Sequence, residues 1–284
     1  MKKQQFILVG SGVILLMLIY FFGNTTPPKK PQSAVDKAGS TLPKKLDFSV
    51  ILRAAKEKLP AGQQAYLNGL ESSVVRGDVK DQQMKVYRQL AGYWRDTIHF
   101  FEPYAYYTGA AAKLENSEKS LTFAARQFLN ELKGINQPAM KQWMSDQARD
   151  LFEKALIVNP DNDSSKIGLG SCYIFGSTGD SPQEVMTGIQ KILEVTRRDS
   201  TNMYGQLMLG IGGVVSGQLD KAVERLTKVA VKEPGNLEAI FMLADAYERK
   251  KDNANAIRWY EKGKKYISND QMVKEIDEKI KSLK

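Results

Sequence analysis

Residues that could perform acid–base, redox or metal chemistry are few in this sequence. Among its 284 residues there is one histidine, His99, and one cysteine, Cys172. His99 lies close to Asp96 and Glu102, a grouping that could move protons, but no second catalytic partner or nucleophile motif accompanies it. A lone cysteine forms no intrachain disulfide or thiolate cage, and a lone histidine rules out a histidine-rich metal site. We therefore predict that the protein is not an enzyme and uses no metal or cofactor.

Two further segments carry residues that often bind ligands. The stretch 205–217 contains G-x-G spacing, but no strand precedes it, so a phosphate-binding loop is not expected. The segment 93–107, YWRDTIHFFEPYAYY, contains seven aromatic residues. Such rings could stack on a sugar or a peptide, although we favour the interpretation that they pack two helices together around Pro103.

The distribution of charge argues against a nucleic-acid-binding protein. The formal net charge is +9, and residues 1–45 contain seven lysines and one aspartate, a local charge of +6. The rest of the chain therefore carries only +3. A nucleic-acid-binding domain carries its basic excess on the folded surface, so no nucleic-acid partner is expected.

The N-terminus has the pattern of a membrane anchor. After the tail 1–5, which contains two lysines, residues 6–22 form an uncharged apolar run with aromatic residues at its far end. As a helix this run would reach roughly 25 Å, at about 1.5 Å per residue, which is the short end of a bilayer span. The bulky Phe21 is unsuitable before a signal-peptidase cut at Gly23. We therefore predict a single transmembrane signal-anchor helix at 6–22.

Residues 23–45 are rich in proline and lysine, a composition that cannot bury a core and predicts an extended linker. Because the short N-terminal tail is easily retained inside the cell, we expect the soluble domain on the periplasmic side of the cell membrane. Lys29 and Lys30 follow the anchor directly and leave a cytoplasm-facing adaptor as the alternative.

From Leu46 onward, apolar residues recur at helical spacing, and no alternating strand pattern is sustained. In the N-terminal part, helices are expected near residues 47–58, 62–76, 80–101, 103–115 and 118–133. Further along, the spacing of apolar and small residues repeats at 34 residues. The corresponding positions are Gln206, Leu209, Gly210, Gly213, Ala222 and Leu226 in one copy, and Ile240, Leu243, Ala244, Tyr247, Ala256 and Tyr260 in the next. The small residues let two antiparallel helices approach closely.

This pattern resembles the tetratricopeptide repeat, whose period and small-residue positions it matches. The resemblance implies an all-α solenoid of helical hairpins. Within residues 163–202 an inserted loop follows Gly176, and Ser181-Pro182 then begins a helix. The expected organisation is a helical N-terminal region with degenerate repeat-like hairpins at 46–133, a partial repeat at 134–162, full repeats at 163–202, 203–236 and 237–270, and a capping helix at 271–284.

The family's pattern implies a binding groove along the first helices of the repeats. The second, fifth, ninth and twelfth places of each unit should face it. The candidate partner-binding residues are Ile167, Ser171, Tyr204, Leu207, Ile211, Glu238, Phe241, Asp245 and Glu248. Because this set is apolar in the middle and acidic at its C-terminal end, we expect a partner segment that is hydrophobic with a basic flank.

By resemblance, the chain looks like bacterial single-span repeat proteins, some of which assist translocon clients or cytochrome c maturation. We therefore expect a membrane-tethered scaffold or escort that binds other proteins in the cell envelope. The alternative is an envelope structural or assembly subunit that binds glycan or peptidoglycan through the aromatic segment 93–107.

Overall fold

Helices form the regular structure of residues 46–76, 79–177 and 181–284, which are the part of the chain that the computed structural model describes, and no strand occurs within it. These residues belong to one unit, Pro43–Lys284. The predicted tail 1–5, anchor 6–22 and linker 23–45 lie outside the described residues. Within the described ranges, no helix has the length and hydropathy needed to cross a bilayer. The all-α prediction is confirmed for this part.

The N-terminal helices pack around their own apolar cluster. They are α2 (Phe48–Lys56), α3 (Ala61–Arg76), α4 (Lys80–Tyr93), a π-helical turn (Trp94–Ile98) and α5 (Phe101–Glu115). Leu67, Leu90 and Trp94 are fully buried in this cluster. The helix expected over 80–101 is therefore interrupted at Trp94, and His99 ends the π turn in the left-handed conformation with φ 60°.

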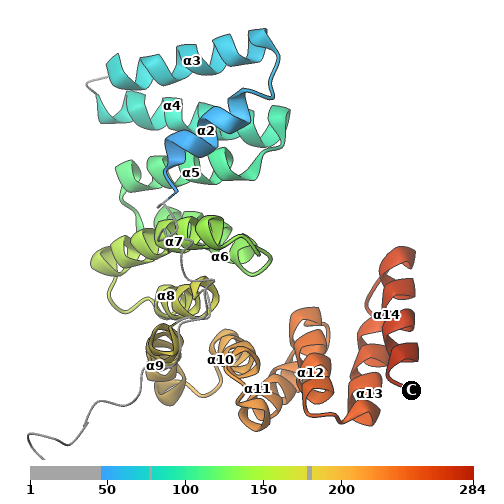
Figure 1. Cartoon of the computed structure of the whole chain (residues 1–284). Helices are drawn as coiled ribbons and strands as arrows, with labels where there is room; N and C mark the ends of the chain where they lie inside the picture. Colours follow the sequence, from blue (N-terminus) through green and yellow to red (C-terminus); the bar gives the residue numbers. More distant parts are fainter. Residues whose placement is uncertain (1–45, 77–78, 178–180) are drawn as a thin grey trace, which may run out of the picture. The chain divides into compact units, whose positions relative to one another are not determined.

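Four helical hairpins follow, and each consists of two antiparallel helices that pack extensively on one another (Figure 1). A final helix, α14 (Asp270–Ser282), packs on α13 with Ile276 and Ile280 buried, where a capping helix was predicted. The hairpins are α6 (Glu118–Leu132) with α7 (Pro138–Val158), α8 (Asp163–Gly176) with α9 (Pro182–Arg198), α10 (Met203–Val215) with α11 (Leu219–Lys232), and α12 (Leu237–Arg249) with α13 (Asn253–Lys264).

The first helix of each hairpin begins at a side-chain cap. Asn162, Asn202 and Asn236 precede α8, α10 and α12, and each side-chain oxygen accepts a hydrogen bond from the backbone N–H three residues later. Ser117 does the same before α6. Such caps satisfy one of the N–H groups that a helix N-terminus leaves unpaired. The four first helices therefore start in the same register.

Close helix–helix approach depends on small residues, as the repeat pattern predicts. At Gly170 an added Cβ would lie 2.7 Å from the backbone oxygen of Gly188, so α8 and α9 cross nearly backbone to backbone. At Gly210 it would lie 2.6 Å from Leu226 Cγ on α11. A side chain at either position would push the two helices apart.

The helix α6 is the first half of the hairpin that ends with α7. The sequence pattern alone assigns this helix to the N-terminal region 46–133 and leaves 134–162 as a partial repeat without a first helix. In the structure α6 lies next to α5 as expected, but it packs more extensively on α7. The connection at residues 133–137 separates the two helices, so the partial repeat is completed by residues upstream of it.

Candidate functional site

The first helices of the four hairpins form a continuous layer. Helix α8 contacts both α6 and α10, and α10 contacts α12. This layer holds all the residues predicted to face a partner. In the common register set by the caps, the second place is occupied by Lys119, Ser164, Tyr204 and Glu238.

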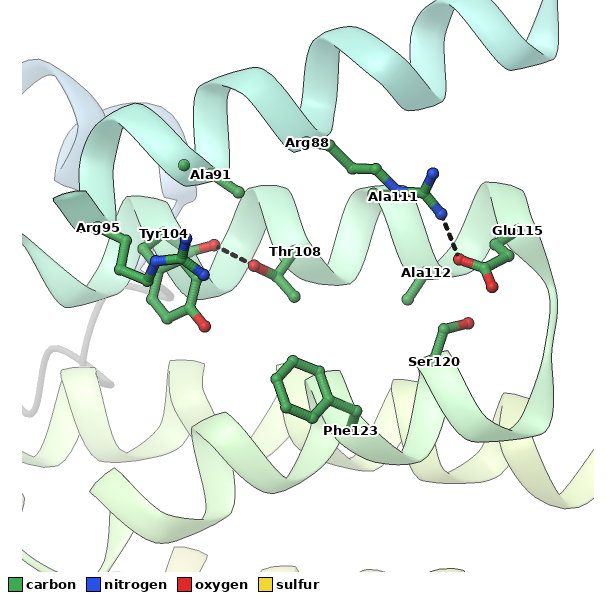
Figure 2. Close-up of a pocket in the computed structure, with 11 residues that line it drawn as sticks. Arg88, Ala91, Arg95, Tyr104, Thr108, Ala111, Ala112, Glu115, Ser120 and Phe123 are labelled. Carbon is green, nitrogen blue, oxygen red and sulfur yellow. Dashed lines mark hydrogen bonds and ion pairs between the residues drawn. The ribbon is translucent and has the colours of Figure 1, made fainter.

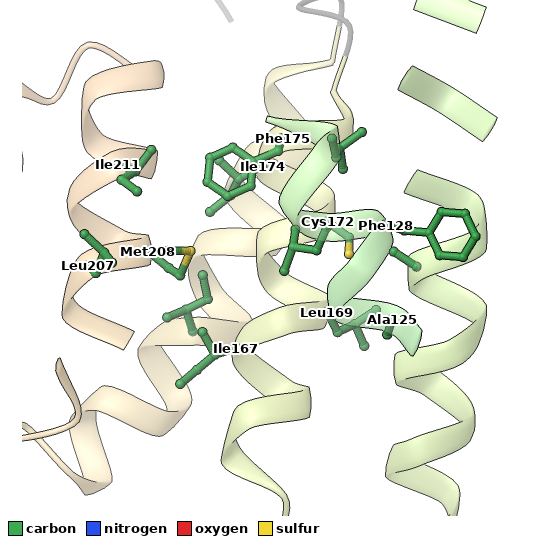
Figure 3. Packing of buried hydrophobic residues seen from close by; sticks show 14 of the residues in the cluster. Ala125, Phe128, Ile167, Leu169, Cys172, Ile174, Phe175, Leu207, Met208 and Ile211 are labelled. Atoms are coloured by element: carbon green, nitrogen blue, oxygen red, sulfur yellow. The ribbon is translucent and has the colours of Figure 1, made fainter. Parts of the chain in front are cut away.

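Four of the predicted groove residues are covered in this structure. Ile167 is 0% exposed, and Leu207 and Ile211 are each 6% exposed. Ser171 is buried as well, and its hydroxyl donates to the Ile167 carbonyl oxygen at 2.8 Å. Figure 3 shows Ile167 and Ile174 of α8 among the buried side chains, with Met208 of α10 pointing toward them. These four side chains pack the layer together, and their contact with a partner stays a prediction.

The other five predicted residues, Tyr204, Glu238, Phe241, Asp245 and Glu248, remain half-buried. Among them, Phe241 supports the hairpin α12–α13. Its ring lies 6.2 Å from that of Tyr260, and a Cβ added at Gly263 would lie 2.7 Å from it. One side of this ring is therefore committed to packing.

The predicted acidic end is present, but the protein's own cations neutralise it. Asp245 pairs with Arg249 at 3.0 Å, one helical turn further along α12. Glu248 pairs with Lys279 of α14 at 2.6 Å and accepts a hydrogen bond from the Tyr260 hydroxyl at 3.3 Å. A basic partner would have to compete with these cations.

Two cations of α6 that the sequence analysis missed lie against the layer. The Arg126 guanidinium donates to the Ser164 hydroxyl and stacks over the Tyr204 ring, 5.5 Å from its centre. The Lys133 ammonium, at the end of α6, pairs with Glu238 at 2.5 Å and lies 5.5 Å from the centre of the Phe175 ring. Arg126 could have been predicted from the sequence by taking Ser117 as a helix cap, because counting from that cap puts Arg126 at the ninth place of a repeat.

Tyr204 is held in its neutral form. Burial raises the pKa of Tyr204 to about 12, and the positive charge of Arg126 opposes part of that rise. Like an ordinary tyrosine, Tyr204 is neutral at physiological pH, and its ring offers an aromatic face to a cation.

A cleft of about 290 Å³ lies between α4, α5 and α6 (Figure 2). Arg88 pairs with Glu115 at 2.7 Å, and the Arg95 guanidinium lies 5.7 Å from the centre of the Tyr104 ring. Phe123 at its rim is 53% exposed. Because Glu115 and Asp96 each pair with one of the two arginines, the cleft has little net charge to select a ligand.

A second cleft, of about 360 Å³, lies where α8, α9 and α10 meet. Its lining is mostly apolar and includes Ile174, Met186 and Val215. Met186 and Val215 are exposed, although both are large apolar residues. This cleft adjoins the layer of first helices and has room for one large apolar side chain.

The residues considered for chemistry are not brought together. Cys172 is buried in α8, and burial raises the pKa of its thiol, so it is not poised as a nucleophile. His99 is exposed. In the aromatic segment, Trp94 is 0% and Tyr107 4% exposed, so both rings belong to the core. No cluster of three metal-ligating side chains occurs among residues 46–76, 79–177 and 181–284.

Three solved structures illustrate what the chain is similar to. A crystal structure of the MamA protein has a TM-score of 0.43 and 16% identity, with 64% of this chain and 91% of that chain covered. For YrrB, described as a tetratricopeptide-repeat protein with an unusual peptide-binding site, the TM-score is 0.41 and the identity 15%, with 68% of this chain and 91% of that chain covered. For MamA from Desulfovibrio magneticus RS-1, residues 41 to the end, the TM-score is 0.44 and the identity 18%, with 67% of this chain and 96% of that chain covered.

No curated protein matches the sequence. The family model described as tetratricopeptide repeat matches residues 207–269, a range that begins in α10 and ends just beyond α13. The predicted repeats are thereby confirmed for this segment. Over residues 207–269 the chain is similar to the tetratricopeptide-repeat family.

Proposed function

We propose that the protein is a non-catalytic scaffold that binds other proteins along the layer formed by α6, α8, α10 and α12. The observation that carries this proposal is the match of residues 207–269 to the tetratricopeptide repeat, a module that presents its first helices to partners. The layer and its caps extend the same arrangement back to Glu118.

The proposal includes a membrane tether at residues 6–22, with the soluble domain on the periplasmic side. Its support is the uncharged apolar run after Lys2 and Lys3 and the proline- and lysine-rich composition of residues 23–45. If residues 6–22 tether the protein to the membrane, the full chain stays in the membrane pellet after alkaline extraction. A chain that begins at Leu46 is then recovered in the supernatant. Recovery of both in the supernatant would remove the tether from the proposal.

The partner is a hydrophobic segment with a basic flank. The cleft lined by Ile174, Met186 and Val215 supplies apolar surface beside the layer. Tyr204 and Glu238 supply an aromatic face and a carboxylate. The alternative, glycan binding through residues 93–107, is not favoured, because Trp94 and Tyr107 are buried and the other five aromatic residues of the segment are half-buried and pack against the core clusters.

The test is photo-crosslinking in the cells that make the protein. A photoreactive residue at Phe241, on the layer, should capture a discrete set of proteins that mass spectrometry identifies. The matched control places the same photoreactive amino acid at Glu261, which is exposed on α13. Equal capture from both positions would contradict the proposal.

The captured partner then allows a binding test. Replacing Phe241→Ala together with Asp245→Lys should weaken binding about tenfold, because it removes an aromatic contact and reverses a charge. The matched control, Arg258→Ala with Glu261→Lys, changes two exposed residues of α13 and should leave binding unchanged. A melting curve of each variant shows whether weaker binding comes from the lost contacts or from a less stable fold.

A further inference from the structure

The second place of the repeats is already contacted by cations in the free protein. Arg126 contacts both Ser164 and Tyr204, and Lys133 contacts Glu238. These are the three residues that the repeat register puts at the second place of α8, α10 and α12. A single stripe of α6 therefore contacts all three.

These contacts are made by the tertiary fold rather than by neighbouring residues of one helix. Lys133 and Glu238 are separated by 105 positions, and Arg126 and Tyr204 lie on helices two hairpins apart. Tyr204 offers a ring face and Glu238 offers a carboxylate, and the Phe175 ring, although only 8% exposed, lies directly under the Lys133 ammonium. All of these groups attract ammonium and guanidinium ions.

The contacts are also weak enough to exchange. Arg126 is exposed on α6, and in the ion pair at the end of that helix the Lys133 and Glu238 side chains are 27% and 39% exposed. Exposed ion pairs and cation–π contacts contribute little to stability because water and salt screen them. A partner that brings its own cations can therefore replace them.

We infer that Tyr204, Glu238 and the Phe175 ring form a cation-binding subsite for arginine and lysine side chains of the partner, and that Arg126 and Lys133 occupy it when no partner is bound. This inference rests on the proposed function and deepens it, because it assigns the basic flank of the partner to particular residues. The chain's own cations then compete with the partner's.

The spacing of the two cations predicts the spacing in the partner. Arg126 and Lys133 are separated by seven positions on α6, which corresponds to about 10 Å at about 1.5 Å per residue. In a partner segment with polyproline II geometry, which has a rise of about 3.1 Å per residue and three residues per turn, three positions cover about 9 Å and place both side chains on the same side. An extended partner segment should therefore carry two cations with two residues between them.

A peptide titration tests the inference on the full chain. The probe is a fluorescein-labelled synthetic peptide, Ser-Leu-Arg-Leu-Leu-Lys-Leu-Ser, followed by anisotropy. One comparison peptide places Arg and Lys next to each other, and another replaces both with Gln. The first peptide should bind most tightly to the unaltered protein, and added salt should weaken its binding.

Variants of the protein give the decisive comparison. Arg126→Ala with Lys133→Ala should bind the first peptide about fivefold more tightly, because the competing cations are gone. Tyr204→Leu with Glu238→Gln should bind it about fivefold less tightly. The matched control, Lys85→Ala with Arg197→Ala, removes two exposed cations from α4 and α9 and should leave affinity unchanged.

Three results would overturn the inference: no binding of the cationic peptide, no preference for its spacing, or unchanged affinity after loss of Arg126 and Lys133. Each leaves the proposed function to be judged separately by crosslinking from Phe241. If crosslinking captures a partner whose bound segment lacks cations, the proposed function stands and the cation-binding subsite does not.

Discussion

The crossing of α8 and α9 gives the sharpest stability prediction. At Gly170 an added Cβ would lie 2.7 Å from the Gly188 backbone oxygen and 2.6 Å from Ile192 Cγ1. A backbone carbonyl cannot turn aside as a side chain can, so Gly170→Ala must separate the helices. Overpacking of this kind costs about 1–3 kcal/mol. Alanine's better helix propensity returns up to about 1 kcal/mol. Because the obstacle is a backbone carbonyl, the overpacking cost lies in the upper part of that range, about 2–3 kcal/mol, and the expected net loss is about 1–2 kcal/mol.

The matched control is Gly69→Ala on α3, where an added Cβ would meet no described atom within 4 Å. There only the propensity gain remains, so the free energy of unfolding should rise by about 0.5–1 kcal/mol. The assay is thermal and urea unfolding of both variants, followed by circular dichroism at 222 nm. Gly170→Ala should lower Tm by roughly 2–8 °C, and Gly69→Ala should raise it.

Two results would refute this reasoning. If both substitutions stabilised the protein alike, α8 and α9 would not approach as closely as the structure has them. If neither substitution changed the melting curve, the observed transition would report on a part of the chain that includes neither α3 nor the hairpin α8–α9. Because repeat arrays need not unfold in one step, the transition should be followed at several urea concentrations.

Two further predictions concern a helix cap and a titrating side chain. Asn202→Ala removes the cap of α10, whose side-chain oxygen accepts from the Gly205 N–H at 2.9 Å, and should cost about 1 kcal/mol in urea unfolding. Gln218→Ala, before α11, is the control, because no described side chain caps that helix; equal effects would contradict the assignment. The folded pKa of Tyr204 is about 12, above its unfolded value near 10, so its contribution to stability is complete below pH 10 and lost as pH rises to about 12. Tyr204→Phe should flatten the fall in stability over that range, and an unchanged slope would show that Tyr204 titrates normally.

The helical hairpins from α8 to α13 could be predicted from the sequence because their signals are local. Small residues such as Gly210 and Ala222 recur at fixed positions of the repeat pattern. An asparagine also precedes each of α8, α10 and α12. Such signals depend on nearby residues and on a spacing that a single sequence shows. A helix near 118–133 was predicted, but its pairing with α7 was not, because alanines and Phe128 replace the glycine-rich pattern there and residues 133–137 lengthen the hairpin connection.

The site was harder to predict because it depends on how helices far apart in the sequence meet. The register assigned Ile167 and Leu207 to the layer of first helices, but their burial follows from how closely α8 and α10 pack. The pairing of Glu248 with Lys279 depends on the docking of α14. The break at Trp94 also has no local signature, because a π turn differs from an α-helix by a single hydrogen-bond register.

Hydrogen–deuterium exchange of the full chain, with and without its captured partner, shows whether partners bind the layer of first helices. Binding there should slow exchange in α8, α10 and α12 and leave exchange at the exposed faces of α9, α11 and α13 unchanged. Protection confined to the second helices, or to residues 93–107, would contradict it.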